Sequence, residues 1–152
     1  MIFLKTTSLH QIFKNELKIP KYHLQVGAND VFCFNPPDWF VTVQSATDFL
    51  KKNLDKNELF FALPYEPIYY FLSGKDSPTR QLCFQDIMNI SPKEEAAVIR
   101  DLEEKHVNWI LISNAIEAWE SKNSKEGKPY CALLMYYIGE NFTPVQPFGA
   151  WG

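Results

Sequence analysis

The chain has 152 residues, of which 46% are hydrophobic and 22% are charged, and its formal net charge is −3. This length suits one domain with a sizeable core, and the aromatic content of 15% indicates that Phe, Tyr and Trp fill much of that core. Because the 15 basic residues form no stripe, nucleic-acid binding lacks its usual electrostatic source and no nucleic-acid partner is expected.

No stretch of the chain is long and apolar enough to cross a membrane. The longest apolar stretch, residues 60–72, contains Glu66 and two prolines and falls well short of the ~20 residues that a spanning helix needs. Polar residues directly follow residues 1–5, so the start of the chain does not have the pattern of a secretory signal. We therefore expect the chain as given to be soluble.

The first 37 residues are predicted to form an extension made of a helix and a hairpin. Apolar residues at spacings of three and four predict a short amphipathic helix before Pro20: Leu9, Ile12, Phe13 and Leu17. Apolar and polar residues then alternate over 22–26, which indicates a strand, and turn residues at 27–30 lead to a second strand at 31–34.

Helix and strand signals alternate in the remaining part, 38–150. A helix is predicted from about 39 to 53, with Asp38 as its N-cap, and the apolar run at 59–63 fits a strand buried on both faces. A short helix follows, which Pro67 opens and Gly74 ends in the left-handed conformation. Residues 82–84 are predicted to form a short strand.

A capping box gives the strongest local signal of the second half. Ser91, Pro92 and Glu94 predict a helix that begins there and runs to about Lys105. The segments after it are predicted to be a buried strand at 109–112, an exposed loop at 119–130, a helix at 132–138 and an edge strand at 142–148, which Pro144 and Pro147 interrupt.

This alternation predicts an α/β fold. We expect an open, mostly parallel sheet flanked by helices in a Rossmann-like three-layer arrangement, with the N-terminal helix and hairpin as an addition. The whole chain, 1–152, is predicted to be a single domain.

Few residue patterns indicate catalysis or metal binding. The cysteines and histidines are widely spaced: Cys33, Cys83, Cys131, His10, His23 and His106. The cysteines form no CxxC pair and are expected to be small buried hydrophobes, and the histidines lack zinc-ligand spacing. There is no GxGxxG, GxSxG or HExxH motif, so the sequence predicts no cofactor, no metal and no catalytic residue.

The clearest candidate site lies where two predicted strands end. In open α/β sheets ligands bind outside the carboxyl ends of the strands, and here these ends are residues 64–66 and 113–114. Glu66 is the only acid in its apolar stretch, so burial would raise its pKa, as a general acid requires. The structural alternative is that Glu66 begins the next helix and complements its dipole.

Neighbouring residues complete the candidate site. Tyr65, Tyr69 and Tyr70 offer rings that stack on a sugar or base, or that bury one face in the core. Arg80 offers a bidentate group for phosphate, or one member of an ion pair with Asp76 or Asp86. The candidate substrate-binding residues are therefore Tyr65, Glu66, Tyr69 and Arg80.

Three motifs here carry a resemblance to a known family: Leu63-Pro-Tyr-Glu-Pro67, Tyr70-Phe-Leu-Ser-Gly74 and Pro78-Thr-Arg80. They resemble the soluble C-terminal domain of polytopic membrane glycosyltransferases related to the protein mannosyltransferases, which use dolichyl- or polyprenyl-phosphate sugars as donors. Weaker similarity at 94–112 and 137–149 extends the resemblance to about residues 38–150.

The resemblance implies a domain on the extracytoplasmic (periplasmic) face of the membrane. Its partners would be the membrane-embedded part of the same polypeptide and the glycosyl acceptor. The family's catalytic acids lie in the membrane half, and no position here matches them. The chain departs from the family in two ways: it lacks the membrane half, and its predicted loop at 114–130 is longer. It is therefore expected to be either an excised fragment or a stand-alone relative.

Three hypotheses follow for the function. The first is a non-catalytic accessory domain of such a glycosyltransferase that aids acceptor binding or stability. The alternative is a stand-alone small α/β enzyme or ligand-binding domain with its site near Tyr65, Glu66 and Arg80. The third, a protein-interaction module, requires an exposed aromatic patch of several hundred Å².

Overall fold

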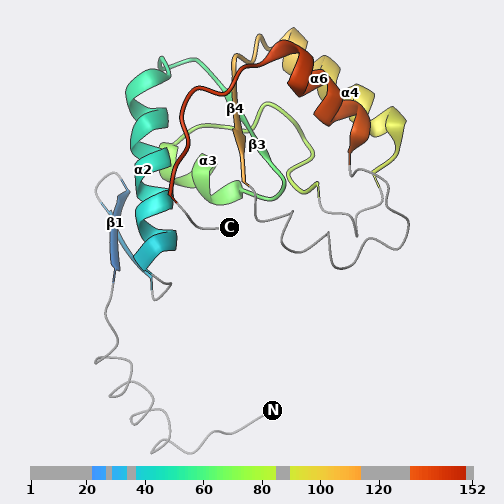
Figure 1. Cartoon of the computed structure of the whole chain (residues 1–152). Coiled ribbons are helices and arrows are strands. Elements are labelled where there is room, and N and C mark those ends of the chain that lie inside the picture. Colours follow the sequence, from blue (N-terminus) through green and yellow to red (C-terminus); the bar gives the residue numbers. More distant parts are fainter. Residues whose placement is uncertain (1–21, 27–28, 34–36, 85–89, 114–130, 150–152) are drawn as a thin grey trace, which may run out of the picture.

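The computed structural model describes residues 22–26, 29–33, 37–84, 90–113 and 131–149, and within these ranges the side chains from residue 38 onward. A small parallel sheet lies at the centre of the larger part (Figure 1). β3 (Phe60–Leu63) pairs with β4 (Trp109–Ile112), so that Phe60 lies opposite Trp109. The two apolar runs therefore form strands as predicted, and their carboxyl ends lie side by side.

Helices pack on both faces of this sheet. Because side chains alternate along a strand, Phe60 and Ala62 of β3 pack with one pair of helices and Phe61 and Leu63 with the other. All of β3 is buried, which confirms the predicted strand with two buried faces. The first pair is α2 (Pro37–Asn53) and α3 (Pro67–Ser73), and the second is α4 (Pro92–Glu104) and α6 (Ala132–Asn141).

The helix ends follow the predicted chemistry with small differences. At the start of α4, Ser91 Oγ accepts from the Glu94 N–H at 3.3 Å, and Glu94 Oε2 accepts from the Ser91 N–H at 2.8 Å. Gly74 ends α3 with a left-handed φ of 69°. α2 begins at Pro37, so Asp38 lies in its first turn instead of at the predicted N-cap.

A separate hairpin precedes this core. β1 (Tyr22–Val26) pairs antiparallel with β2 (Asn29–Cys33), and β1 lies beside α2 (Figure 1). The predicted hairpin is confirmed, although its second strand begins two residues earlier than expected. The helix predicted near 9–17 and the loop predicted at 119–130 lie outside the described residues.

Two predicted strands are wrong. Residues 82–84 join no ladder; instead the Phe84 N–H donates to the Pro64 carbonyl at 2.7 Å, and the Phe84 ring is buried edge-on against Phe61. Residues 142–148 are irregular, because Pro144 and Pro147 have no N–H for a ladder. The described residues thus form a mixed helix and strand fold with a two-stranded parallel sheet, and a larger Rossmann-like sheet is not confirmed.

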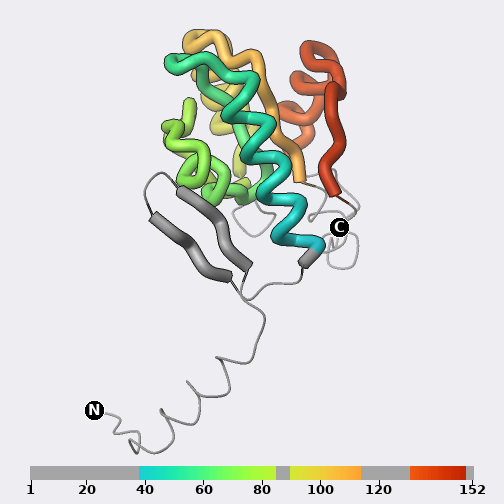
Figure 2. The backbone as a smooth tube through the Cα atoms, turned by 90° about the vertical axis from the view of Figure 1, so that its left-hand side faces the viewer, coloured from blue at the N-terminus to red at the C-terminus, as the bar shows by residue number. Residues whose placement is uncertain are grey.

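Figure 2 shows how the core surrounds the sheet. α2 runs across the view, with α3 on one side of it and the segment 142–148 on the other. This segment, which we call the C-terminal strap, leads from α6 back to α2 and passes β4 (Figure 1). No described helix is long and apolar enough to span a bilayer.

Candidate functional site

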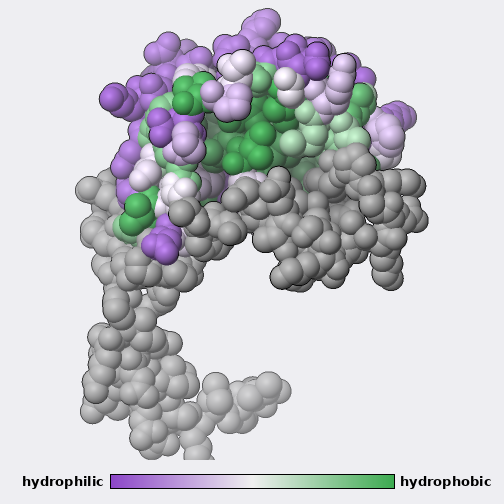
Figure 3. Space-filling view, in the orientation of Figure 1, coloured by the Kyte–Doolittle hydropathy of each residue, from purple (hydrophilic) through white to green (hydrophobic). Residues whose placement is uncertain are grey.

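A groove with a volume of about 870 Å³ lies along β4. It is lined by residues 108–113, by α2 and α6, by Glu66 and Tyr69, and by the C-terminal strap. Figure 3 shows this region as a hollowed apolar surface with hydrophilic residues along its upper border. The groove is large enough for a small molecule to enter.

The groove exists because the two strands differ at their outer edges. On β3 the Ala62 N–H donates to the hydroxyl of Tyr70 at 2.9 Å, so α3 covers that edge, and the Tyr70 ring stacks on Phe60 at 4.7 Å. Within the described part of the chain no strand pairs with the outer edge of β4. Ile112 is 49% exposed, so the prediction that β4 is a buried strand is wrong.

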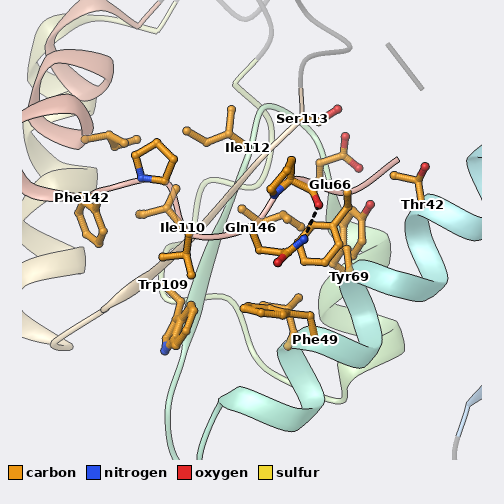
Figure 4. A pocket seen from close by; sticks show the side chains of 18 of the residues that line it. Thr42, Phe49, Glu66, Tyr69, Trp109, Ile110, Ile112, Ser113, Phe142 and Gln146 are labelled. Atoms are coloured by element: carbon orange, nitrogen blue, oxygen red, sulfur yellow. Dashed lines mark hydrogen bonds between the residues drawn. The ribbon is translucent and has the colours of Figure 1, made fainter. Parts of the chain in front are cut away.

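Aromatic side chains form much of the groove. Phe49 makes edge-to-face contacts with Trp109, at a centroid distance of 5.8 Å, and with Phe148, at 5.3 Å. Figure 4 shows Phe49 and Trp109 together at one end of the pocket. The six aromatic residues that line it are Trp39, Phe49, Tyr69, Trp109, Phe142 and Phe148.

The C-terminal strap is fixed at both ends. At its start the Phe142 N–H donates to the Ile138 carbonyl at 2.9 Å, which ends α6. Directly after its far end, Gly149 has a φ of 66°, and a Cβ there would lie 1.9 Å from Thr42 Oγ1 of α2. Only glycine permits this approach, so the strap packs directly on α2 and closes one side of the groove.

A polar cluster lies at the end of the groove opposite Phe49 and Trp109, where β3 and β4 finish. Ser113 follows β4, and its hydroxyl donates a hydrogen bond to the carboxylate of Glu66, which follows β3 across a cis Leu63–Pro64 bond. Tyr69 of α3 lies beside them (Figure 4). The cluster thus forms where the rule for strand ends predicts it.

Burial dominates the electrostatics of this cluster. It raises the pKa of Glu66, and the hydrogen bond from Ser113 partly offsets the rise. Burial, together with the nearby charge of Glu66, raises the pKa of Tyr69 to about 12. Glu66 is the only charged side chain among the described residues that line the groove.

The structure separates the four predicted substrate-binding residues. Glu66 and Tyr69 line the groove. Tyr65, which is 52% exposed, and Arg80, which is also exposed, do not line it. Glu66 does occupy the N-cap position of α3, as the structural alternative expected, but its side chain makes no capping hydrogen bond. Asp86, one predicted ion-pair partner of Arg80, lies outside the described residues.

Sequence reasoning missed most of the groove. The strap was predicted to be a strand, and nothing in the sequence signalled that Trp39, Phe49, Trp109 and Phe148 line one groove. Cys131 is buried and Cys83 is half-buried. The described residues bring together no group of three His, Cys, Asp or Glu that suits a metal ion.

Comparisons with models of protein families, with curated protein sequences and with solved structures gave no match. The resemblance to the glycosyltransferase domain therefore stays a prediction from the three motifs. The arguments about function below start from the groove and its polar cluster.

Proposed function

We propose that this domain binds an elongated, mostly apolar ligand in the groove and does not transform it. The observation that carries the proposal is a groove lined by six aromatic rings, with a polar cluster at one end where β3 and β4 finish. Ligand sites commonly combine a volume of 300–1,000 Å³, apolar walls and a few polar groups that fix orientation. The groove has each of these properties.

Two tryptophans and one glycine allow a direct test. Trp39 and Trp109 line the groove, so their fluorescence should change when a neutral probe, n-decanol, occupies it. Gly139 of α6 also lines it, and a Cβ there would meet nothing within 4 Å. Gly139→Phe should therefore fold normally and fill part of the groove.

The matched control is Ala132→Phe, an exposed position on the same helix outside the groove. We expect Gly139→Phe to weaken n-decanol binding at least tenfold and Ala132→Phe to leave it unchanged. Equal binding by the two variants, or no fluorescence change in the unaltered chain, contradicts the proposal.

For the protein as a whole, we propose an accessory role in a membrane glycosyltransferase that uses a polyprenyl-phosphate sugar. The motifs at 63–67, 70–74 and 78–80 support this role, and the first of them holds Glu66. On this proposal the domain lies at the extracytoplasmic face, contacts the membrane-embedded part, and receives the acceptor in its groove. Because helices cover both faces of parallel strands, we also propose that the complete sheet is Rossmann-like.

This role has a biochemical test. The purified chain, incubated with a polyprenyl-phosphate sugar and decyl glucoside as acceptor, should form no glycosylated product and release no free sugar. Turnover by the chain alone would refute both the accessory role and the proposal that the ligand is not transformed, while leaving ligand binding intact.

A second candidate function is acid–base catalysis by Glu66. The raised pKa of this carboxyl, in an apolar groove beside Ser113, is the observation that favours it. Tyr65 and Arg80 take no part, since neither lines the groove. If Glu66 is catalytic, a substrate screen should find a reaction that Glu66→Gln abolishes, while this variant still binds n-decanol. If the screen finds no such reaction, the binding proposal is favoured.

A further inference from the structure

We infer that the groove selects a ligand whose polar end is a positively charged ammonium group, bound by the carboxylate of Glu66. The inference rests on the proposed function and adds to it the chemistry of the ligand's head group. It concerns the polar cluster of Glu66, Ser113 and Tyr69, while the aromatic end of the groove holds the apolar body of the ligand.

Charge complementarity is the first argument. Among the described residues that line the groove, Glu66 carries the only charge, and no Lys or Arg lies there. A carboxylate has about four acceptor sites, and the hydroxyl of Ser113 supplies one donor. Partly buried charges are normally paired, so an ammonium group would add the counter-charge that the groove itself does not provide.

The aromatic surroundings give the second argument. Tyr69 lies next to Glu66 in Figure 4, and its ring lines the same pocket. Aromatic faces attract cations through their quadrupole, and this attraction increases where water is excluded. A negatively charged head group would instead face both the Glu66 carboxylate and the negative faces of the rings.

The position of the cluster gives the third argument. Glu66 and Ser113 lie at one end of the groove, whereas Phe49 and Trp109 lie at another (Figure 4). A ligand with its apolar chain along the aromatic residues would therefore bring one end, and not its middle, to the carboxylate. This arrangement suits an amphipathic molecule with one terminal head group.

Four probes with the same chain and different head groups test the inference. They are n-decylamine, n-decanol, decyl glucoside and decyl sulfate, each titrated below its micelle concentration with fluorescence of the unaltered chain as the signal. We expect decylamine to bind at least tenfold more tightly than decanol and decyl sulfate at least tenfold more weakly. Tighter binding of the glucoside than of the amine would overturn the inference in favour of a sugar head group.

Variants connect this selectivity to Glu66. In Glu66→Gln the ratio of decylamine to decanol affinity should fall from at least tenfold to about one. Glu104→Gln, at an exposed position of α4 outside the groove, should keep the full ratio. An unchanged ratio in Glu66→Gln would overturn the inference.

The same titrations separate the two proposals. If decanol binds and decylamine shows no preference, the head-group inference fails and the binding function stands. If neither decanol nor decylamine binds, the proposed function fails, and the inference fails with it.

Discussion

Replacement of Glu95 should lower the stability of the fold more than that of any exposed acid. Glu95 lies on α4, is only 5% exposed, and its Oε2 accepts a hydrogen bond of 2.8 Å from the Leu134 N–H in the first turn of α6. The N-cap of α6, Cys131, has a left-handed backbone and provides no side-chain cap. Glu95 therefore caps α6 from a neighbouring helix.

The structure sets the size of the expected effect. A hydrogen bond to a charged acceptor contributes about 1.5–3 kcal/mol, and a carboxylate near a helix N-terminus adds about 0.3–1 kcal/mol. Glu95→Ala removes both and leaves the Leu134 N–H without its partner, so we expect a loss of about 3 kcal/mol. Glu95→Gln keeps an acceptor of the same shape and loses only the charge, which should cost about 1 kcal/mol.

Urea denaturation followed by circular dichroism measures these changes. For a domain of this size, about 3 kcal/mol corresponds to a fall in Tm of roughly 6–12 °C. The exposed Glu104→Gln serves as control and should stay within about 0.5 kcal/mol of the unaltered chain. A loss below about 1 kcal/mol in Glu95→Ala, or a larger loss in Glu95→Gln, would refute the capping role.

Three other substitutions should change stability in predictable directions. Thr47 is buried on α2 and its hydroxyl has no partner among the described residues, so Thr47→Val should raise the free energy of unfolding by about 1 kcal/mol in urea denaturation. Gly149→Ala should lower the free energy of unfolding by about 1 kcal/mol, because the new Cβ would contact Thr42 and the residue has a positive φ. Gly139→Ala should not lower the free energy of unfolding, because the space around Gly139 is open. Glu66→Gln should raise the free energy of unfolding near pH 8. In a series of urea denaturations at different pH values, this gain should vanish below the unfolded pKa of about 4.5. A gain that does not depend on pH would contradict the raised pKa of Glu66.

The direction of the Glu66 effect follows from proton binding. Because burial raises the pKa of Glu66 in the folded chain, the folded state holds a proton between the unfolded and folded pKa values. The unaltered chain therefore loses stability as the pH rises through that window. The glutamine of the variant binds no proton in this range, so position 66 adds no such loss in the variant. Tyr69 faces the same cluster, but its pKa of about 12 keeps it neutral over this range.

Local chemistry made a large part of the fold predictable. The capping box at Ser91 and Glu94 and the left-handed Gly74 each depend on neighbouring residues in the chain, and both are found where the sequence places them. The meeting of Glu66 and Ser113 was also within reach, because each directly follows a strand and the strands are parallel. These predictions needed no knowledge of distant contacts.

The remaining predictions failed where distant contacts decide the structure. The strap lies along β4 because Phe148 packs on Phe49 and Gly149 on Thr42, contacts that no spacing within 142–148 reveals. Tyr65 is exposed and lies outside the groove, although it directly precedes Glu66, which lines the groove. From the sequence alone, a residue that lies outside a site cannot be distinguished from a neighbour that lines it.

Glu66 and Glu95 together offer the sharpest distinction between a site and a structural element. Glu95 is buried and accepts a hydrogen bond from a helix N–H, whereas Glu66 is half-buried and faces an open groove, with the hydroxyl of Ser113 as a donor. When a carboxylate that supports the fold is neutralised, the free energy of unfolding of the domain falls. When a carboxylate that is held in a groove for a ligand is neutralised, this free energy rises. Glu95→Gln and Glu66→Gln should therefore shift the urea midpoint at pH 8 in opposite directions. Shifts of the same sign would mean that Glu66 supports the corner between β3 and α3, and the groove would then lack a residue placed there for binding.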